Sequence, residues 1–425
     1  MDRIVVRGGR PLRGHVRVSG SKNAALPILA ATLMAEGETI LENVPNLRDV
    51  ETILQILRGL GVEGGRQPDG TIRVHVANED LVQAPYELVS TMRASVCVLG
   101  PLLARRRRAR VSLPGGCVFG VRPIDLHLKG LRSLGAHLAV QHGDVVAEAE
   151  RLRGAEVYLG GPYGSTVLGT GNVMMAAALA DGRTVIECAA SEPEVADLAR
   201  FLNQMGARIQ GAGTHRILID GVKRLHGTCY RVIPDRIEAG TFLVAAAMTR
   251  GEVTVEGALP EHLAAVLDKL EEIGVALERH PGHLKACRNG PLHPTDVVTL
   301  PFPGFPTDLQ AQFMALLSTV PGVSVISEKV YPDRFIHAAE LNRMGANIRK
   351  EGDHAILQGV ERLSGAPVMA SDLRASAALV LAGLVAQGET EVHRVYHLDR
   401  GYERIEEKFR ALGADIERVR DDREE

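Results

Sequence analysis

A cysteine in a glycine-rich stretch is the first residue of this sequence whose setting suggests chemistry. Cys117 follows Gly115 and Gly116 and stands five residues before Arg122. A guanidinium group near a thiol lowers the thiol pKa and favours the reactive thiolate, a setting that a structural cysteine does not need. The glycines would let such a loop swing and close over a site. We therefore predict a functional thiol at Cys117, with an inert loop cysteine as the alternative.

Cationic side chains stand at the starts of apolar, helix-like segments elsewhere in the chain. Lys22, Arg93 and Arg374 each occupy such a position. A cation at a helix N-terminus opposes the helix dipole, so we expect each of them to need an anion as its partner. If these helices run parallel, their N-terminal ends meet at one face, which would attract a phosphate or a carboxylate. The pattern predicts an anionic substrate and leaves the reaction open.

Polar residues at the same helix starts have a simpler explanation. Ser21, Thr307 and Asp372 are residue types whose side chains accept hydrogen bonds from the free N–H groups of a first helical turn. We predict that these three residues are N-caps.

The elements that must position these residues follow an internal repeat. An amphipathic helix is followed by a glycine, then Ala or Val, then a strand, and the glycines recur every 68 to 74 residues. Each glycine suits the position after a helix where a positive φ is wanted. The glycines are Gly61, Gly135, Gly206, Gly274, Gly345 and Gly413.

A second kind of helix alternates with the first and is rich in Ala, Leu and Met. A helix that is apolar almost all round is buried, whereas the amphipathic helices should lie outside. The chain therefore consists of six helix-plus-strand units, which we group as two domains of three. The apolar helices, each with its following strand, occupy 22–44, 91–113, 171–189, 237–257, 309–328 and 373–395.

The natural break between the two domains falls near residues 230–234, between the third and fourth units. The last unit has no room for its closing strands, and the strands predicted within residues 1–21 could complete it. We therefore predict a first domain at 22–232, which carries the Cys117 loop, and a discontinuous second domain at 1–21 plus 233–425.

Composition excludes several classes of protein. The net charge is −3 with 24% charged residues, so neither nucleic acid nor a membrane surface is expected as a partner. We interpret Arg105–Arg108 as a solvated turn before a strand at 109–113. No apolar run reaches the roughly 18 residues that a membrane helix needs, and the N-terminus has no signal-peptide pattern.

The five cysteines show neither metal-ligand spacing nor a CxxC pair, and their number is odd. A reduced cytoplasmic protein fits this pattern best. We place Cys97 in the core, because it stands in an apolar helix, and we expect His127 and His397 to be structural. The sequence predicts no metal site and no organic cofactor.

Several long motifs, spread over both halves of the chain, resemble one enzyme family. The family is that of the UDP-N-acetylglucosamine 1-carboxyvinyltransferases, which are enolpyruvyl transferases. A related family, the 3-phosphoshikimate 1-carboxyvinyltransferases, shares the fold but lacks the cysteine loop and the RPxDLH stretch. The motifs are SKNAA (21–25), PGGCVFGVRPIDLH (114–127), PDRIEAGTFLVAAA (234–247), FPTDLQAQF (305–313), and DLRASAALVLAG (372–383) followed by DRGYERIE (399–406).

The resemblance implies a fold and a reaction. The implied α/β fold is a two-domain inside-out barrel with six βαβαββ-type units, three per domain, and an active site in the cleft between the domains. The implied reaction transfers the enolpyruvyl group of phosphoenolpyruvate to the 3′-hydroxyl of UDP-N-acetylglucosamine and releases phosphate. It proceeds by addition and elimination through a tetrahedral intermediate, and it is the first committed step of peptidoglycan synthesis.

The resemblance also implies a role for individual residues. Cys117 would donate a proton to C3 of phosphoenolpyruvate and can form a covalent adduct, Asp308 would be the general base, and Asn23 would lie at the reacting centre. The residues implied to hold phosphoenolpyruvate are Lys22, Arg122, Arg374 and Arg400. Those implied to contact the nucleotide sugar are Arg93, Arg122, Pro123, Ile124, Asp125, Leu126, Asp308 and Val330, with Arg334 and Asp372 as further cleft residues.

One position departs from the family pattern. Gly164 stands where many relatives have a lysine that touches the diphosphate. An enolpyruvyl transferase with a different acceptor is therefore the alternative enzyme, and a catalytically silent nucleotide-sugar binder is the alternative from another class. We expect a monomer, with an oligomer as the alternative.

Overall fold

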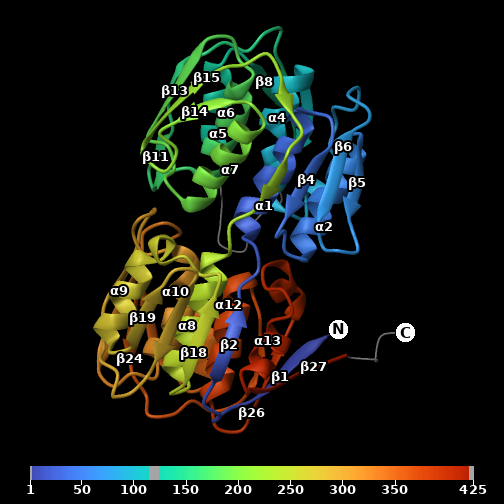
Figure 1. Cartoon of the computed structure of the whole chain (residues 1–425). Coiled ribbons are helices and arrows are strands. Elements are labelled where there is room, and N and C mark those ends of the chain that lie inside the picture. Colours follow the sequence, from blue (N-terminus) through green and yellow to red (C-terminus); the bar gives the residue numbers. More distant parts are fainter. Residues whose placement is uncertain (1, 114–123, 421–425) are drawn as a thin grey trace. The chain divides into compact units, whose positions relative to one another are not determined.

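Apolar helices and the strands that flank them make up this computed structural model, which describes residues 2–113 and 124–420. Contacts divide the chain into two units. The terminal unit consists of Met1–Ser19 and Pro234–Glu425, and the middle unit is Gly20–Ile233. Figure 1 shows the chain entering the middle unit once and leaving it once.

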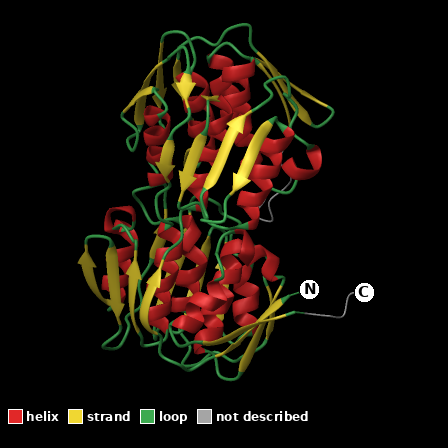
Figure 2. Cartoon of the chain, turned by 45° about the vertical axis from the view of Figure 1, so that its right-hand side comes forward, coloured by secondary structure: helices red, strands yellow, loops and turns green. Residues whose placement is uncertain are grey.

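Within the described residues, three apolar helices lie at the centre of each unit. They are buried because apolar side chains surround almost their whole circumference, and strands flank them in Figure 2. The prediction of buried Ala- and Leu-rich helices is confirmed. They are α1 (Lys22–Ala31), α4 (Leu99–Arg106) and α6 (Val167–Ala178) in the middle unit, and α8 (Arg236–Met248), α10 (Gln310–Leu317) and α12 (Leu373–Val385) in the terminal unit.

The second helix of each repeat is amphipathic and buries one face. The glycine that follows each of these helices has a φ between 82° and 108°, as the sequence predicts. These helices are α2 (Arg48–Gly59), α5 (Asp125–Ser133), α7 (Pro193–Gln204), α9 (Ala264–Ile273), α11 (His337–Arg343) and α13 (Ile405–Ala411).

Small sheets cover the central helices of the middle unit. Each sheet has a core of antiparallel strands. Two of the sheets also have one edge strand, β10 (Glu156–Tyr158) or β17 (Cys229–Arg231), that pairs in parallel with its neighbour. In spatial order they are β17 (Cys229–Arg231), β4 (Thr39–Glu42), β6 (Ile72–Val76) and β5 (Val62–Arg66); β10 (Glu156–Tyr158), β13 (Arg183–Glu187), β15 (Arg216–Asp220) and β14 (Arg208–Gln210); and β7 (Arg108–Ser112), β9 (Asp144–Glu148) and β8 (His137–Gln141).

The sheets of the terminal unit follow the same plan, each with one parallel edge pair. In spatial order they are β25 (Pro367–Met369), β26 (Glu389–His393), β1 (Arg3–Arg7) and β27 (Asp415–Val419); β19 (Ala276–His280), β20 (His283–Cys287), β18 (Glu252–Glu256) and β2 (Arg13–Arg17); and β21 (Val297–Thr299), β22 (Val323–Glu328), β24 (His354–Gln358) and β23 (Asn347–Glu351).

The N-terminal strands belong to the terminal unit. β1 lies between β26 and β27, with Ile4 opposite Val392 and Val6 opposite Ile416. β2 pairs in parallel with β18. Figure 1 shows these blue strands beside strands from the yellow and red end of the chain. The first residues of the chain therefore complete sheets whose other strands follow residue 250.

Short elements connect the repeats. The small strands are β3 (Ala35–Glu36), β16 (Leu225–His226), β11 (Gly160–Gly161) and β12 (Gly164–Ser165), and α3 is a single turn at Tyr86–Val89. The 3-10 segments are Thr32–Met34, Arg93–Val98, Pro260–His262, Thr307–Leu309 and Val395–Arg400.

The arginine run differs from its prediction as a solvated turn. Arg105 and Arg106 form the end of α4 and are half-buried, Arg107 has a φ of 59°, and Arg108 begins β7. Arg105 pairs with Glu79 at 2.8 Å, while Arg106 donates to the carbonyl oxygens of two residues, Leu60 and Leu81. These distant partners hold part of the run in the last turn of the helix.

No helix in the described part of the chain is both long and apolar enough to cross a membrane. Cys97 has no exposed surface, which confirms its prediction as a core residue, and burial raises the pKa of its thiol to about 12.

Candidate active site

In the terminal unit, Asp308 lies against two buried arginines. Arg334 Nη1 donates to Asp308 Oδ1 at 2.8 Å, and Arg374 Nη2 donates to Asp308 Oδ2 at 3.0 Å. The arginine side chains are 7% and 2% exposed, whereas the aspartate side chain is 27% exposed. The carboxylate is therefore the part of this ionic triad that solvent, or a substrate, can reach.

The two guanidinium groups decide the charge of Asp308. Burial alone would raise the pKa of this carboxyl group, but Arg374 and Arg334 hold the pKa well below its usual range. Asp308 is therefore ionised at neutral pH. A carboxylate stabilised in this way is a weak base toward an alcohol while both guanidinium groups remain in place.

Helix starts position two members of the triad, Arg374 and Asp308. Asp372 is the N-cap of α12 and accepts from the N–H groups of Arg374 at 2.8 Å and Ala375 at 3.1 Å. Arg374 thus lies in the first turn of α12, and Asp308 lies in the 3-10 turn that precedes α10. The predicted N-cap role of Asp372 is confirmed. The same holds for Ser21, whose hydroxyl accepts from Ala24 N–H at 3.4 Å.

The prediction that Thr307 is an N-cap is wrong. Pro306 occupies the cap position of the turn and makes no side-chain cap hydrogen bond. The Thr307 hydroxyl instead donates to Glu328 Oε2 at 2.9 Å and accepts from Arg334 at 3.1 Å. The hydroxyl does not cap the helix because it binds Glu328, a buried acid distant in the sequence.

Glu328 was missed in the sequence and organises one side of the triad. This carboxylate has no exposed surface, and its Oε1 accepts from Thr299 at 2.6 Å and from the N–H groups of Val330 at 3.0 Å and Tyr331 at 2.9 Å. It therefore fixes the turn that holds Val330, a residue implied in sugar binding. The available signal was an acid that ends the apolar strand VSVISE.

A polar network beneath Arg374 was also missed. The guanidinium carbon lies 5.3 Å from the ring centroid of Tyr402, whose side chain is buried. The Tyr402 hydroxyl lies 2.9 Å from Thr241 Oγ1 and accepts from Gln312 Nε2 at 3.0 Å. Tyr402, together with side chains from the two central helices α8 and α10, thus supports Arg374 from within the core.

In the middle unit, Lys22 and Asn23 open α1. Lys22 Nζ lies 3.1 Å from Asp49 Oδ2, and the two side chains are 11% and 6% exposed. The prediction that Lys22 and Arg374 each need an anion as a partner is therefore confirmed, with a protein carboxylate as the partner in both cases. Asp49 and Asp308 are protein carboxylates that the fold brings to these cations from other segments.

The other sugar-binding candidates of the middle unit lie at two element starts. Arg93 begins the 3-10 segment before α4, and Asp125 and Leu126 begin α5, whose N-cap is the buried Ile124. Asp125 is exposed and Leu126 is half-buried. Cys117, Arg122 and Pro123 lie outside the described residues.

His127 is a structural residue. It is 3% exposed and its Nδ1 lies 2.9 Å from Asn172 Nδ2. Burial, aided by the charge of Arg93, lowers the pKa of His127 to about 3. The ring is therefore neutral at pH 7 and joins α5 to α6.

Arg400 ends the 3-10 segment Val395–Arg400 in the terminal unit and is half-buried. Burial lowers the pKa of the neighbouring His397, and the charge of Arg400 lowers it further. Among residues 2–113 and 124–420, no group of three His, Cys, Asp or Glu side chains is arranged to hold a metal ion.

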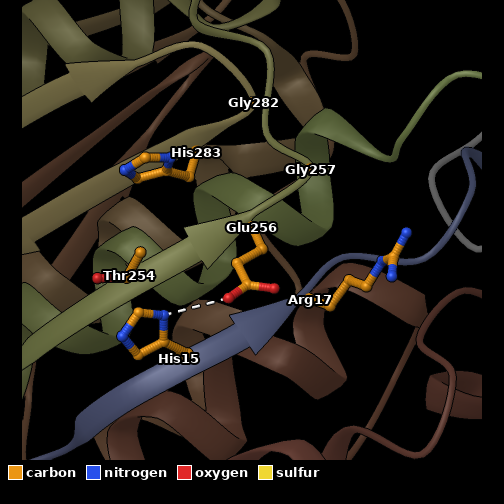
Figure 3. Close-up of a pocket in the computed structure, with 7 residues that line it drawn as sticks. All are labelled: His15, Arg17, Thr254, Glu256, Gly257, Gly282 and His283. Carbon is orange, nitrogen blue, oxygen red and sulfur yellow. Dashed lines mark hydrogen bonds and ion pairs between the residues drawn. The ribbon is translucent and has the colours of Figure 1, made fainter.

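A cavity of about 520 Å³ lies elsewhere on the terminal unit, over strands β2, β18 and β20. Figure 3 shows His15, Glu256 and His283 along this surface, with His15 Nδ1 3.1 Å from Glu256 Oε1. None of the predicted site residues lines it. The candidate site therefore lies apart from this cavity.

Comparison with known proteins identifies the family. The model of the EPSP synthase (3-phosphoshikimate 1-carboxyvinyltransferase) family matches residues 6–409. A UDP-N-acetylglucosamine 1-carboxyvinyltransferase of Methylacidiphilum infernorum is 56% identical over 99% of each chain, and one of Carboxydothermus hydrogenoformans is 55% identical over 99% of this chain and the whole relative. The chain belongs to the EPSP synthase family and, within it, to the UDP-N-acetylglucosamine 1-carboxyvinyltransferases.

Solved structures of this family agree with the fold. The enolpyruvyl transferase NikO from Streptomyces tendae has a TM-score of 0.88, with 26% identity and coverage of 98% of this chain and 99% of that one. An EPSP synthase from Acinetobacter baumannii, at 20% identity, has a TM-score of 0.73 and covers 99% of this chain and 100% of that one. The predicted α/β fold of the enolpyruvyl transferases, the two-domain inside-out barrel, is confirmed.

Gly164, where we predicted a departure from the family pattern, has a conformation with a local explanation. Gly164 begins β12, which pairs with β11, and has a φ of 95°. A lysine would be strained in this left-handed conformation. The backbone of this hairpin is therefore suited to glycine.

Proposed function

We propose that the chain transfers the enolpyruvyl group of phosphoenolpyruvate to the 3′-hydroxyl of UDP-N-acetylglucosamine and releases phosphate. The similarity to relatives of that name, at 53–56% identity over 99% of the chain, carries this proposal. In the cell, the reaction would be the first committed step of peptidoglycan synthesis. It requires no metal ion and no organic cofactor.

The proposed reaction proceeds by addition and then elimination. Cys117 gives a proton to C3 of phosphoenolpyruvate while the sugar oxygen attacks C2, and Asp308 accepts the proton of the sugar hydroxyl. The tetrahedral intermediate then loses phosphate from C2 and returns a proton from C3 to the Cys117 thiolate, which restores the double bond, while the proton held by Asp308 leaves with the phosphate. The Cys117 thiol can also add across the double bond, with its sulfur on C2 and its proton on C3, to form a covalent adduct. Asn23 would lie at the reacting centre.

The two internal ion pairs suggest how substrate binding would activate the site. Lys22, Arg122, Arg374 and Arg400 would hold phosphoenolpyruvate and stabilise the charge that develops on the leaving phosphate. An anionic substrate that draws the Arg374 guanidinium away from Asp308 raises the basicity of that carboxylate. The base would therefore become effective when its substrate is bound.

The remaining candidates would bind the nucleotide sugar and shape the cleft. We propose a first domain at 22–232 and a second at 1–21 plus 233–425, in a monomeric, cytoplasmic enzyme. The residues proposed to contact the nucleotide sugar are Arg93, Arg122, Pro123, Ile124, Asp125, Leu126, Asp308 and Val330, with Arg334 and Asp372 as further cleft residues.

Phosphate release tests both the acceptor and the thiol. Phosphoenolpyruvate is supplied with UDP-N-acetylglucosamine, with shikimate 3-phosphate or with no acceptor, to the natural protein and to Cys117→Ala. We expect release only with the nucleotide sugar, and a loss of about 100-fold or more in the variant, because positioned proton donors contribute about that factor. Release with shikimate 3-phosphate, or none with the nucleotide sugar, would refute the proposed acceptor.

A further inference from the structure

The chain passes between its two units at two segments, residues 19–21 and 233–235, which we call the crossing segments. Each leads directly into a central helix, because Ser21 is the N-cap of α1 and Asp235 is the N-cap of α8. In the middle unit, Ser21 N–H donates to Ile233 O at 2.7 Å, and in the terminal unit Asp235 N–H donates to Ser19 O at 2.9 Å. The position of one segment therefore sets the position of the other.

The middle unit leaves little room for the first crossing segment to shift. A Cβ atom on Gly20 would lie 1.6 Å from the carbonyl oxygen of Asn43, so the backbone is seated as closely as a glycine allows. The side chain of Asn43 donates to Val232 O at 2.9 Å and so ties the residue just before the second crossing segment to the same place.

Asp197, on helix α7, holds the second crossing segment. Its side chain has no exposed surface, and its Oδ2 accepts from Ile233 N–H at 3.3 Å. Its Oδ1 accepts from the Tyr230 hydroxyl at 2.6 Å and from Arg200 Nη2 at 3.1 Å. The Asp197 carboxylate thus binds both Tyr230, which lies in β17, and Ile233, the last residue of the middle unit.

A continuous series of hydrogen bonds leads from Asp197 to the candidate site. Asp197 fixes Ile233, Ile233 fixes Ser21, and the next two residues are Lys22 and Asn23 at the start of α1. We propose that Asp197 is a positioning residue that sets the first turn of α1, and with it the Lys22 ammonium group, for binding of the anionic substrate. This inference rests on the proposed function, because it takes phosphoenolpyruvate as the ligand of Lys22.

The energetics of the buried group favour this role over simple stabilisation. Burial raises the pKa of Asp197, while the bonds from Tyr230 and Ile233 and the charge of Arg200 oppose this rise. A buried ionic group is often no more stabilising than a well-packed apolar one. The advantage of a buried carboxylate over an apolar side chain is that its hydrogen bonds fix the positions of several donors.

The terminal unit holds its own crossing segment in the same manner. Glu238 on α8 is 2% exposed and accepts from Ser19 N–H at 2.7 Å and from Lys408 Nζ at 2.6 Å. Two buried carboxylates, on two different helices, thus hold the chain at the points where it passes from one unit to the other. This recurrence supports a role in placing the segments.

Hydrogen exchange and steady-state kinetics of Asp197→Asn test the proposal in the full chain. The control is Asp220→Asn, which removes a carboxylate of the same unit that pairs with Arg183 on the protein surface. We expect amides 21–25 to exchange about tenfold faster and KM for phosphoenolpyruvate to rise about tenfold in Asp197→Asn, since a lost bond to a charged group is worth about that factor. KM for UDP-N-acetylglucosamine should change less than about twofold, and the control should resemble the natural protein.

The remaining outcomes decide against the proposal. Unchanged exchange at 21–25 would show that Asp197 does not set the first turn of α1. A fall in kcat with both KM values preserved would show that its loss lowers only the folded fraction. If Asp197→Asn does not fold, Tyr230→Phe removes one donor and should change the same readouts in the same direction to a smaller extent; no change there overturns the proposal. Hydrogen exchange can be measured without enzyme activity. A failure of the proposed reaction in the natural protein can therefore be told apart from a failure of the positioning role of Asp197.

Discussion

The carboxylate of Asp308 and its two guanidinium partners form a group whose stability depends on pH. Burial would raise the Asp308 pKa, but Arg374 and Arg334 depress it in the folded protein. A depressed folded-state pKa stabilises the protein above the unfolded-state value near 4. That contribution is lost as the pH falls through the lower, folded-state pKa.

Replacing Arg374 with Gln should reverse the balance between burial, which raises the Asp308 pKa, and the arginine charges, which lower it. With one cation gone, burial outweighs the remaining charge, so the Asp308 pKa rises and the acid limb of kcat/KM moves to higher pH. The free energy of unfolding should fall by roughly 3 kcal/mol, as expected for a broken buried ion pair. The pH profile and denaturant unfolding measure these two effects.

Arg349→Gln is the matched control for this prediction. Arg349 is an arginine of the same unit whose side chain is 72% exposed and pairs with Glu351. Exposed pairs contribute little to stability, so neither the pH profile nor the unfolding free energy should change by much. An unshifted acid limb in Arg374→Gln would contradict the assignment of the Asp308 charge to this arginine.

Sequence reasoning identified the charged residues of the site but not their partners. Helix-start positions predicted Lys22 and Arg374, because a cation there is unusual. Asp49 and Glu328 were missed because each acts through a contact with a segment more than twenty residues away. Local patterns carry no information about such pairs, and so Thr307 was predicted to cap a helix when it binds Glu328.

The glycines that follow the outer helices were predictable element by element. A positive φ is a local requirement of the helix end, so residue type and position suffice to predict it. Local patterns did not predict the 3-10 geometry of Arg93–Val98, which lies in a segment expected to be an apolar helix, or the 3-10 turn Thr307–Leu309 that precedes α10. These turns carry Arg93 and Asp308, and tertiary contacts decide their geometry.

Gly345→Ala measures what one of these glycines contributes. Its φ is 91°, and a Cβ would meet no atom within 4 Å, so strain of the backbone is the remaining cost. We expect the unfolding free energy to fall by about 1 to 2 kcal/mol with kcat unchanged. Gly290→Ala is the control, because its added Cβ is equally free of neighbours and its φ is not left-handed. Equal stability of the two variants would contradict the strain argument.

At the scale of the whole molecule, the terminal unit depends on β1. Ile4 and Val6 have no exposed surface, and β1 connects β26 to β27. The prediction that N-terminal strands could complete the last repeat followed from counting repeats. The exact register of β1 could not be predicted from this count, because it depends on side-chain packing against α12.

Ile4→Ala tests this dependence. Deleting buried methyl groups should lower the unfolding free energy by about 2 to 5 kcal/mol. Hydrogen exchange should accelerate in β26 and β27 and remain unchanged in β13 and β15 of the middle unit. Val140→Ala, at a side chain 54% exposed, provides the control. Equal acceleration in both units would mean that they unfold as one.

The placement of β1 between β26 and β27 also has a consequence for synthesis on the ribosome. The described strands of the middle unit have all been made once Ile233 has emerged, so this unit can fold while the rest of the chain is being made. β1 is translated before the middle unit but must wait for residues 389–419 before either of its partners exists. Throughout that interval an apolar strand remains unpaired, and a chaperone that shields this strand would act at this point.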